Sequence, residues 1–202
     1  MTLDLKAADA TLAGLRPFPV AVTTNDGGHL NGLMSLSAGT MSIVPEAPRV
    51  TVSLTKYNLT NTMVMNSGIF AMHLLGNAPE LIDKSLEILM TLGARSGRNG
   101  DKISQLRTKP GVLGCPILLD ALSYVEGKVV HMFDVEESMI FVADVVAAER
   151  LNPGGRLNIG EAWGKLPPEW IEQYETNHHP QLQSARQFRG LPIDGPDGSD
   201  GH

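Results

Sequence analysis

The chain has 202 residues, of which 42% are hydrophobic and 5% aromatic, and this is enough apolar material for the core of one domain. Its formal net charge of −6 argues against a protein that binds nucleic acid, because such a protein would carry a basic stripe. The single cysteine, Cys115, excludes an internal disulfide framework, and no apolar run is long enough to span a membrane.

Residues 1–16 are expected to form a short amphipathic lead-in. Their acidic residues do not match a secretory signal, so we expect a cytoplasmic protein. Alternating, β-branched patterns predict strands at Val20–Asn25, His29–Val44 and Arg49–Leu54. Asp26–Gly28 is a hairpin turn signal, and Glu46–Pro48 breaks the pattern before the third strand. Three strands joined by turns favour an antiparallel sheet or barrel over a βαβ unit.

The pattern changes to a helix at Asn58, which is a candidate N-cap, and Ser67-Gly68 ends this helix. A strand is predicted at Ile69–Leu75, followed by a helix that begins at Asn77, has Pro79 and Glu80 in its first turn and ends at Gly93. Residues 94–111 read as a basic, glycine-containing loop. Further strands are predicted within Gly114–Leu151, with Glu136–Ser138 in the turn between two of them.

These boundaries place one domain at residues 17–151. Residues 152–190 read as a C-terminal extension, and residues 191–202 as a disordered acidic tail with no apolar run to hold it down. Trp163, Trp170 and Tyr174 in the extension either pack it onto the domain or cover a ligand or a partner subunit.

Polar side chains gather where the strand Arg49–Leu54 gives way to the helix. Lys56, Asn58 and Thr60 lie at this junction, and two interpretations stay open. The side chains cap the helix, or they form an anion site in which free N–H groups, hydroxyl groups and one cation bind a phosphate. Small residues at Ser35–Gly39 likewise either permit close packing or let a flat ligand lie on the backbone.

Other candidates for chemistry are weaker. Asp134, Glu136 and Glu137 are read as the solvated tip of a hairpin rather than as paired catalytic carboxylates. His73 is expected to pack or to satisfy a backbone group, Cys115 to be buried and inert, and no metal site is expected from the spacing of the six histidines. The chain also contains no Rossmann or P-loop glycine pattern.

Taken in order, these segments resemble the flavin reductase-like, FMN-binding split-barrel family. The resemblance is carried by the run from Pro17 to Leu75, by the placing of Lys56 and Thr60 ahead of Phe70, and by the later segments GDKISQL, GCPILLDALSYVEGKVV and IFVADVVAAERL. It spans roughly residues 16–151. The fold that it implies is mainly β with peripheral helices: a six-stranded antiparallel split β-barrel that forms a homodimer.

The resemblance also implies a cofactor and a site. The cofactor is FMN, with FAD as a second possibility, and NADH or NADPH is the co-substrate. Lys56, Asn58 and Thr60 would hold the flavin phosphate. Ser35, Leu36, Ser37 and Ala38 would face the ring, and Ser53, Leu54 and Thr55 would line the ribityl path. The implied activity is transfer of a hydride from NAD(P)H to flavin N5, with reduced flavin supplied to a partner monooxygenase.

Two departures from the family pattern affect this expectation. Glu136, Glu137 and Ser138 stand where the family commonly has a Gly-Asp-His turn associated with flavin and nicotinamide binding, and Gly127 stands where a Cys is common. Two carboxylates would oppose a phosphorylated dinucleotide at that turn. The alternatives are therefore a flavin-binding electron carrier or store without reductase activity, and a split-barrel scaffold for another planar or phosphate-bearing ligand.

Overall fold

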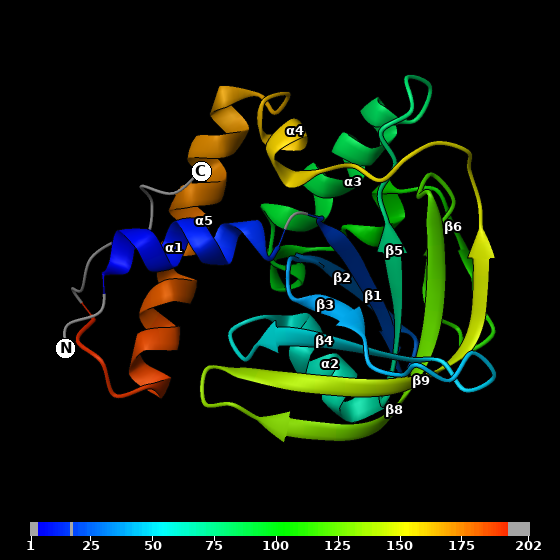
Figure 1. The fold of residues 1–202 in the computed structure, drawn as a ribbon, viewed down its shortest axis with the longest axis horizontal. Helices are drawn as coiled ribbons and strands as arrows, with labels where there is room; N and C mark the ends of the chain where they lie inside the picture. The colour runs from blue at the N-terminus through cyan, green and yellow to red at the C-terminus, as the bar shows by residue number, and fades with distance from the viewer. Residues whose placement is uncertain (1–3, 17, 194–202) are drawn as a thin grey trace.

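A computed structural model describes residues 4–16 and 18–193 of the chain. Its main sheet is antiparallel and has seven strands in the order β2-β1-β5-β8-β9-β4-β3 (Figure 1). The strands of this sheet are β1 (Val20–Asp26), β2 (His29–Ser35), β3 (Ala38–Thr40), β4 (Arg49–Thr55), β5 (Ile69–Leu74), β8 (Ser123–Asp134) and β9 (Ser138–Arg150). A separate two-stranded sheet pairs β6 (Thr108–Pro110) with β7 (Pro116–Leu118).

The sheet closes on itself because β2 and β3 lie at its opposite ends yet follow each other in the chain. Only Leu36 and Ser37 join them, so the two ends of the sheet must meet. At this seam the N–H of Ser53 donates to the carbonyl of Ser37 at 2.8 Å. The result is a mainly β, half-closed barrel, as expected from the sequence.

The main sheet contains seven strands, whereas the sequence predicted a barrel of six. The sequence reads His29–Val44 as one strand because its alternation is continuous, but the chain leaves β1 after Ser35 and pairs with β4 from Ala38. One predicted strand therefore becomes β2 and β3, which belong to different edges. The helix predicted from Asn77 also begins later, at Ile82, after a turn in which the N–H of Leu81 donates to the carbonyl of Ala78.

Helices pack against the outside of the sheet. They are α1 (Leu5–Gly14), α2 (Leu59–Ser67), α3 (Ile82–Gly93), α4 (Ile159–Trp163) and α5 (Pro168–Phe188), with two short 3₁₀ turns, η1 (Gly97–Asn99) and η2 (Ile103–Gln105). Gly68 ends α2 with a φ of 68°, as the sequence predicts for its C-cap. None of the helices among residues 4–16 and 18–193 is both long enough and apolar enough to cross a membrane.

Three apolar clusters form the core of the described residues, and two of them are large. The first fills the barrel and includes Val22, Val52, Phe70 and Phe141, all fully buried. The second lies between the sheet and α3 and extends to the C-terminal segment through Trp170. Because the Trp170 Nε1–H donates to the carbonyl of Met90 at 3.2 Å, the aromatic residues of the extension pack it onto α3.

Buried polar groups inside the fold are satisfied by the backbone. The Glu126 carboxylate accepts from the N–H groups of Val112 and Leu113 at 2.6 and 3.1 Å, which fixes the turn before β7. Cys115 is buried, and burial raises the pKa of its thiol to about 12, so it is the inert cysteine that the sequence predicts. The segment predicted as a tail lies outside the described residues from position 194 onward.

Candidate functional site

The end of β4 and the start of α2 bring several of the predicted site residues together. Asn58 occupies the N-cap position of α2, but its side chain makes no cap hydrogen bond. Instead its Nδ2 donates to Oγ1 of Thr55 at 2.6 Å. The N-cap side chain therefore makes no bond to the first N–H groups of α2, although the N–H of Asn61 donates to the carbonyl of Asn58 at 3.0 Å. An anion would bind to the N–H groups before Asn61. This geometry goes against the capping interpretation of Asn58.

Lys56 lies beside this helix end and is held by a carboxylate from another strand. Its Nζ is 2.6 Å from Oδ1 of Asp134 at the end of β8, and it lies 5.0 Å from the ring centroid of Phe188 at the end of α5. The hydrogen bond from Lys56, followed by that from the N–H of Glu136, lowers the pKa of Asp134. An anion bound here would share the Lys56 ammonium with Asp134.

Thr60 faces the interior side of the same helix end. It is buried, and its Oγ1 accepts from Nδ2 of Asn31 on β2 at 3.2 Å. The side chain of Leu54 belongs to the barrel core, and its carbonyl accepts from Nδ2 of Asn61 at 2.8 Å. Leu54 therefore contributes backbone only.

A second cation, missed by the sequence analysis, lies at the connection between β4 and α2. Arg98 in η1 donates from its Nη1 to the carbonyl of Tyr57 at 2.8 Å, which holds the guanidinium group at the β4–α2 connection. The signal in the sequence is the basic loop at residues 94–111, but nothing local shows that Arg98 reaches across to Tyr57.

The predicted ring-facing residues divide between two surfaces. The Ser35 hydroxyl accepts from the N–H of Ser37 at 3.1 Å and lies 3.4 Å from the carbonyl of Ser53, so it ties the seam. Ser37 is exposed, whereas Leu36 and Ala38 line a cavity inside the barrel. Ser53 and Thr55 alternate on β4 with the inward-facing Val52 and Leu54, so they lie on the outer face of the strand.

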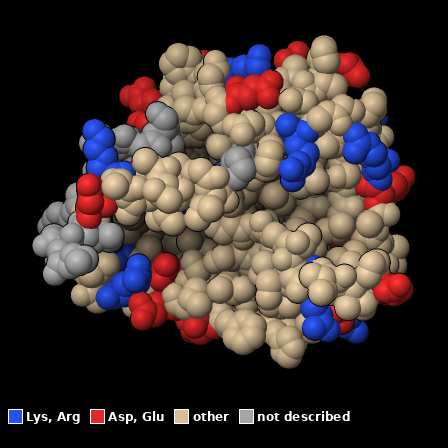
Figure 2. All heavy atoms as spheres, viewed as in Figure 1, with Lys and Arg blue, Asp and Glu red and all other residues tan. Residues whose placement is uncertain are grey.

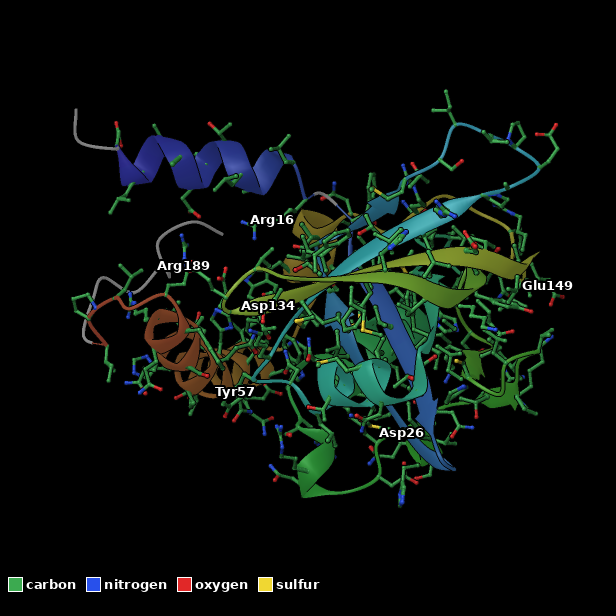
Figure 3. The ribbon with its side chains drawn as sticks, turned by 90° about the horizontal axis from the view of Figure 1, so that it is seen from below. Arg16, Asp26, Tyr57, Asp134, Glu149 and Arg189 are labelled. Carbon is green, nitrogen blue, oxygen red and sulfur yellow. The ribbon has the colours of Figure 1, made fainter. Side chains whose placement is uncertain are left out.

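The β8–β9 turn is exposed at Asp134 and Glu136, as predicted for a hairpin tip, and it also contacts the end of α5. Glu136 has a φ of 67°, a left-handed conformation that is uncommon for a side-chain-bearing residue. Nε of Arg189 lies 3.5 and 3.8 Å from the carboxylates of Glu136 and Glu137. Figure 3 shows Arg189, Asp134 and Tyr57 on one side of the molecule, away from Asp26 and Glu149. The end of α5 thus brings a positive charge to the acidic turn.

Together these groups fit the phosphate end of a nucleotide. The site offers backbone donors, the Thr60 hydroxyl, the Lys56 ammonium and the Arg98 guanidinium, which are the donor types that bind phosphate. The Asp134 carboxylate opposes the binding of an anion, and the single charge of Arg189 offsets part of the charge of Glu136 and Glu137. The side chains present are therefore compatible with a flavin phosphate.

The structure is thus a half-closed antiparallel barrel in which an uncapped helix N-terminus lies close to Lys56 and Arg98. Residues 14–158 match the family described as flavin reductase like domain, which is more than half of the chain. The chain therefore belongs to this family, and the resemblance stated from the sequence is confirmed. Membership defines it as a flavin-related oxidoreductase.

Known proteins agree with this assignment. A ferric-chelate reductase (NAD(P)H) from Archaeoglobus fulgidus is 28% identical over 131 residues, which are 64% of this chain and 73% of the relative. The FMN-binding protein from Thermus thermophilus, solved with 1-cyclohex-2-enone, has a TM-score of 0.58 and 22% identity, covering 66% of this chain and 70% of its own. A nitrilotriacetate monooxygenase component B homologue from Mycobacterium thermoresistibile has a TM-score of 0.63 and 20% identity, covering 82% and 90%.

One further structure is longer than this chain. The chain spans 51% of a protein from Sinorhizobium meliloti 1021, with a TM-score of 0.65, 20% identity and 78% of this chain covered. At these identities the likeness between the solved structures and this chain shows a shared fold.

Proposed function

We propose that the chain binds FMN along the outer face of β4, a surface that we call the flavin groove, and reduces it with NADH or NADPH. Lys56, Asn58 and Thr60 would hold the phosphate, with Arg98 as an additional cation. Ser53 and Thr55, together with the backbone of Leu54, would line the ribityl path. Within the segment Ser35–Ala38 the exposed Ser37 would lie near the ring, whereas Leu36 and Ala38 line the cavity on the inner face of the barrel. When bound, the flavin supplies an acceptor for hydride at its N5 atom.

The observation that carries this proposal is the uncapped N-terminus of α2 beside Lys56 and Arg98. A capping interaction from Asn58 would occupy one of the donors, but that side chain is turned back to Thr55. Membership in the flavin reductase-like family and the name of the Archaeoglobus relative support a flavin and NAD(P)H as the ligands. Whether FMN or FAD binds more tightly is a question for the titration below.

The acidic turn bears on the choice between a reductase and a flavin carrier. Glu136 and Glu137 would oppose a dinucleotide phosphate if they stood alone, but Arg189 lies within 4 Å of both. This pairing lowers the local negative charge and favours the reductase over the carrier. The role in transferring reduced flavin to a monooxygenase component is proposed from the likeness to the component B homologue.

A homodimer is also part of the proposal. Val130, Met132, Phe133 and Val135 at the end of the β8–β9 hairpin are exposed, and the side chain of Ile43 in the β3–β4 loop is fully exposed. Apolar side chains grouped on a monomer surface favour an interface between subunits.

The proposal is tested by titrating the full chain with FMN and with FAD, followed by anaerobic addition of NADH or NADPH. We expect binding, and bleaching of the flavin band faster than for free flavin. Lys56→Ala combined with Thr60→Ala should weaken FMN binding by about tenfold or more, since charge-assisted hydrogen bonds contribute about 1.5–3 kcal/mol each.

Lys84→Ala is the matched control, because Lys84 pairs with Glu87 on α3 and takes no part in the groove. An FMN affinity equal to wild type in the double variant would remove the groove assignment. Tight FMN binding without bleaching by either nicotinamide would leave the flavin carrier as the function.

A further inference from the structure

The inner face of the barrel holds a cavity that the proposed flavin groove does not use. Its volume is about 360 Å³, and it opens between the β3–β4 edge and the strands β1, β5 and β8. Val50 on β4 lines it, whereas Ser53 and Thr55 of the same strand point outward. Strand β4 therefore separates the cavity from the groove.

The walls of this cavity are mostly aliphatic. They are formed by Val20, Leu36, Ala38, Val50, Met72, Leu74 and Val125. Protein interiors pack closely and rarely keep voids much larger than a water molecule, whereas ligand pockets measure about 300–1,000 Å³. A cavity of this size with apolar walls is thus the kind of space that an organic ligand occupies.

Two arginines line the same cavity. Arg156 is fixed by a β-bridge to Gly76, and its guanidinium carbon lies 3.9 Å from the ring centroid of Phe18. Arg16 follows α1, and its Nε donates to the carbonyl of Leu12 at 3.3 Å. Both side chains belong to exposed residues, so they reach solvent where the cavity opens.

Neither arginine is neutralised within the described part of the chain. Arg49, Lys56 and Arg107 each form a salt bridge with an aspartate, but Arg16 and Arg156 form none with residues 4–16 or 18–193. No Asp or Glu is among the residues that line the cavity. Figure 2 shows charged side chains around the margin of this face and uncharged residues at its hollowed centre.

We propose that this cavity binds an amphipathic organic anion, a carboxylate or sulfonate with an apolar body. The apolar body would fill the space among the aliphatic walls, and the anionic head would bind the guanidinium groups of Arg16 and Arg156. Arginine suits this role because its planar fork donates two hydrogen bonds to a carboxylate. The site is separate from the flavin groove and does not depend on the proposed reductase activity.

The experiment measures binding of decanoate by calorimetry to the full chain saturated with FMN, so that the flavin groove is occupied. Decanol and decylammonium are the matched probes with a neutral and a positive head. We expect decanoate to bind at one site per chain at least about tenfold more tightly than either analogue, because only the carboxylate can accept charge-assisted hydrogen bonds.

Two kinds of variant test the binding of the anionic head and of the apolar body separately. Arg16→Gln with Arg156→Gln should weaken decanoate binding by about tenfold or more, whereas the control Arg107→Gln should not. Val125→Phe should fill the cavity and abolish binding while FMN affinity stays at the wild-type value. Because the arginine variants change exposed side chains, they test the proposal even if Val125→Phe does not fold.

Three results would overturn the proposal. The first is equal binding of decanoate and decanol, and the second is unchanged decanoate binding in the arginine double variant. The third is decanoate binding that appears only when the protein is diluted to monomers, because a second copy of the chain would then cover the cavity.

Discussion

His73 makes the stability of this barrel depend on pH. It is fully buried on β5, where its Nδ1 lies 3.2 Å from the carbonyl oxygen of Ala21 and its Nε2 accepts from the N–H of Leu118 at 3.1 Å. One donor and one acceptor are what a neutral imidazole offers. Burial lowers the pKa of His73 from 6.5 to about 4, against the smaller opposing effect of the bond to Ala21.

The sign and size of the effect follow from proton linkage. A pKa that is lowered in the folded state means that the unfolded chain binds the proton first as pH falls. The contribution of His73 is therefore fully present above about pH 6.5 and is lost as pH falls toward 4. Between pH 7.5 and pH 5 the loss is about 2 kcal/mol.

The assay is urea unfolding at these two pH values for the wild type, for His73→Gln and for His29→Gln. Glutamine also offers one donor and one acceptor but does not titrate, and His29 is an exposed control. Titration of other groups cancels in the comparison. On acidification the free energy of unfolding of the wild type and of His29→Gln should each fall by about 2 kcal/mol more than that of His73→Gln. Equal losses in all three proteins would refute the assignment of a buried, neutral His73.

Three further changes test the packing of the fold. Glu126→Gln should lower the free energy of unfolding by about 1–3 kcal/mol in urea, because a neutral amide replaces a carboxylate that accepts two backbone N–H groups; an unchanged midpoint would show that these bonds are not needed. Gly127→Ala should cost about 1–3 kcal/mol, because a Cβ there would lie 2.8 Å from that of Ala143, and a melting temperature equal to wild type would contradict this. Lys102→Met should speed amide exchange at the end of α3, where the Lys102 ammonium donates to the carbonyls of Leu92 and Arg95; exchange at the wild-type rate would count against that role.

Local sequence patterns predicted most of the barrel strands. Alternating residues and turn signals placed β1 and β4 within a residue. The turn predicted at Glu136–Ser138 lies one residue earlier, at 135–137, because Ser138 already belongs to β9. The break between β2 and β3 was not predictable in this way, because alternation continues through Leu36 and Ser37 while the pairing partner changes.

The contacts within the candidate site were harder to predict from the sequence, because the residues that meet there are distant in the chain. Lys56 and Thr60 were identified from their place at a helix start, which is a local feature. Their partners Asp134 and Asn31 come from other strands, and Phe188 comes from the end of α5. Long-range ion pairs and aromatic contacts leave no periodic trace, so only the folded chain reveals them.

The two-residue link between β2 and β3 makes the Ser53 amide a reporter of local opening. This amide closes the seam by donating to Ser37, so it exchanges with solvent when the seam parts, even if the rest of the sheet stays paired. Leu36 faces the cavity and Ser53 faces the outer groove, so a ligand on either face contacts the same short seam. A ligand bound in the cavity or in the outer groove would then slow deuterium uptake at the Ser53 amide.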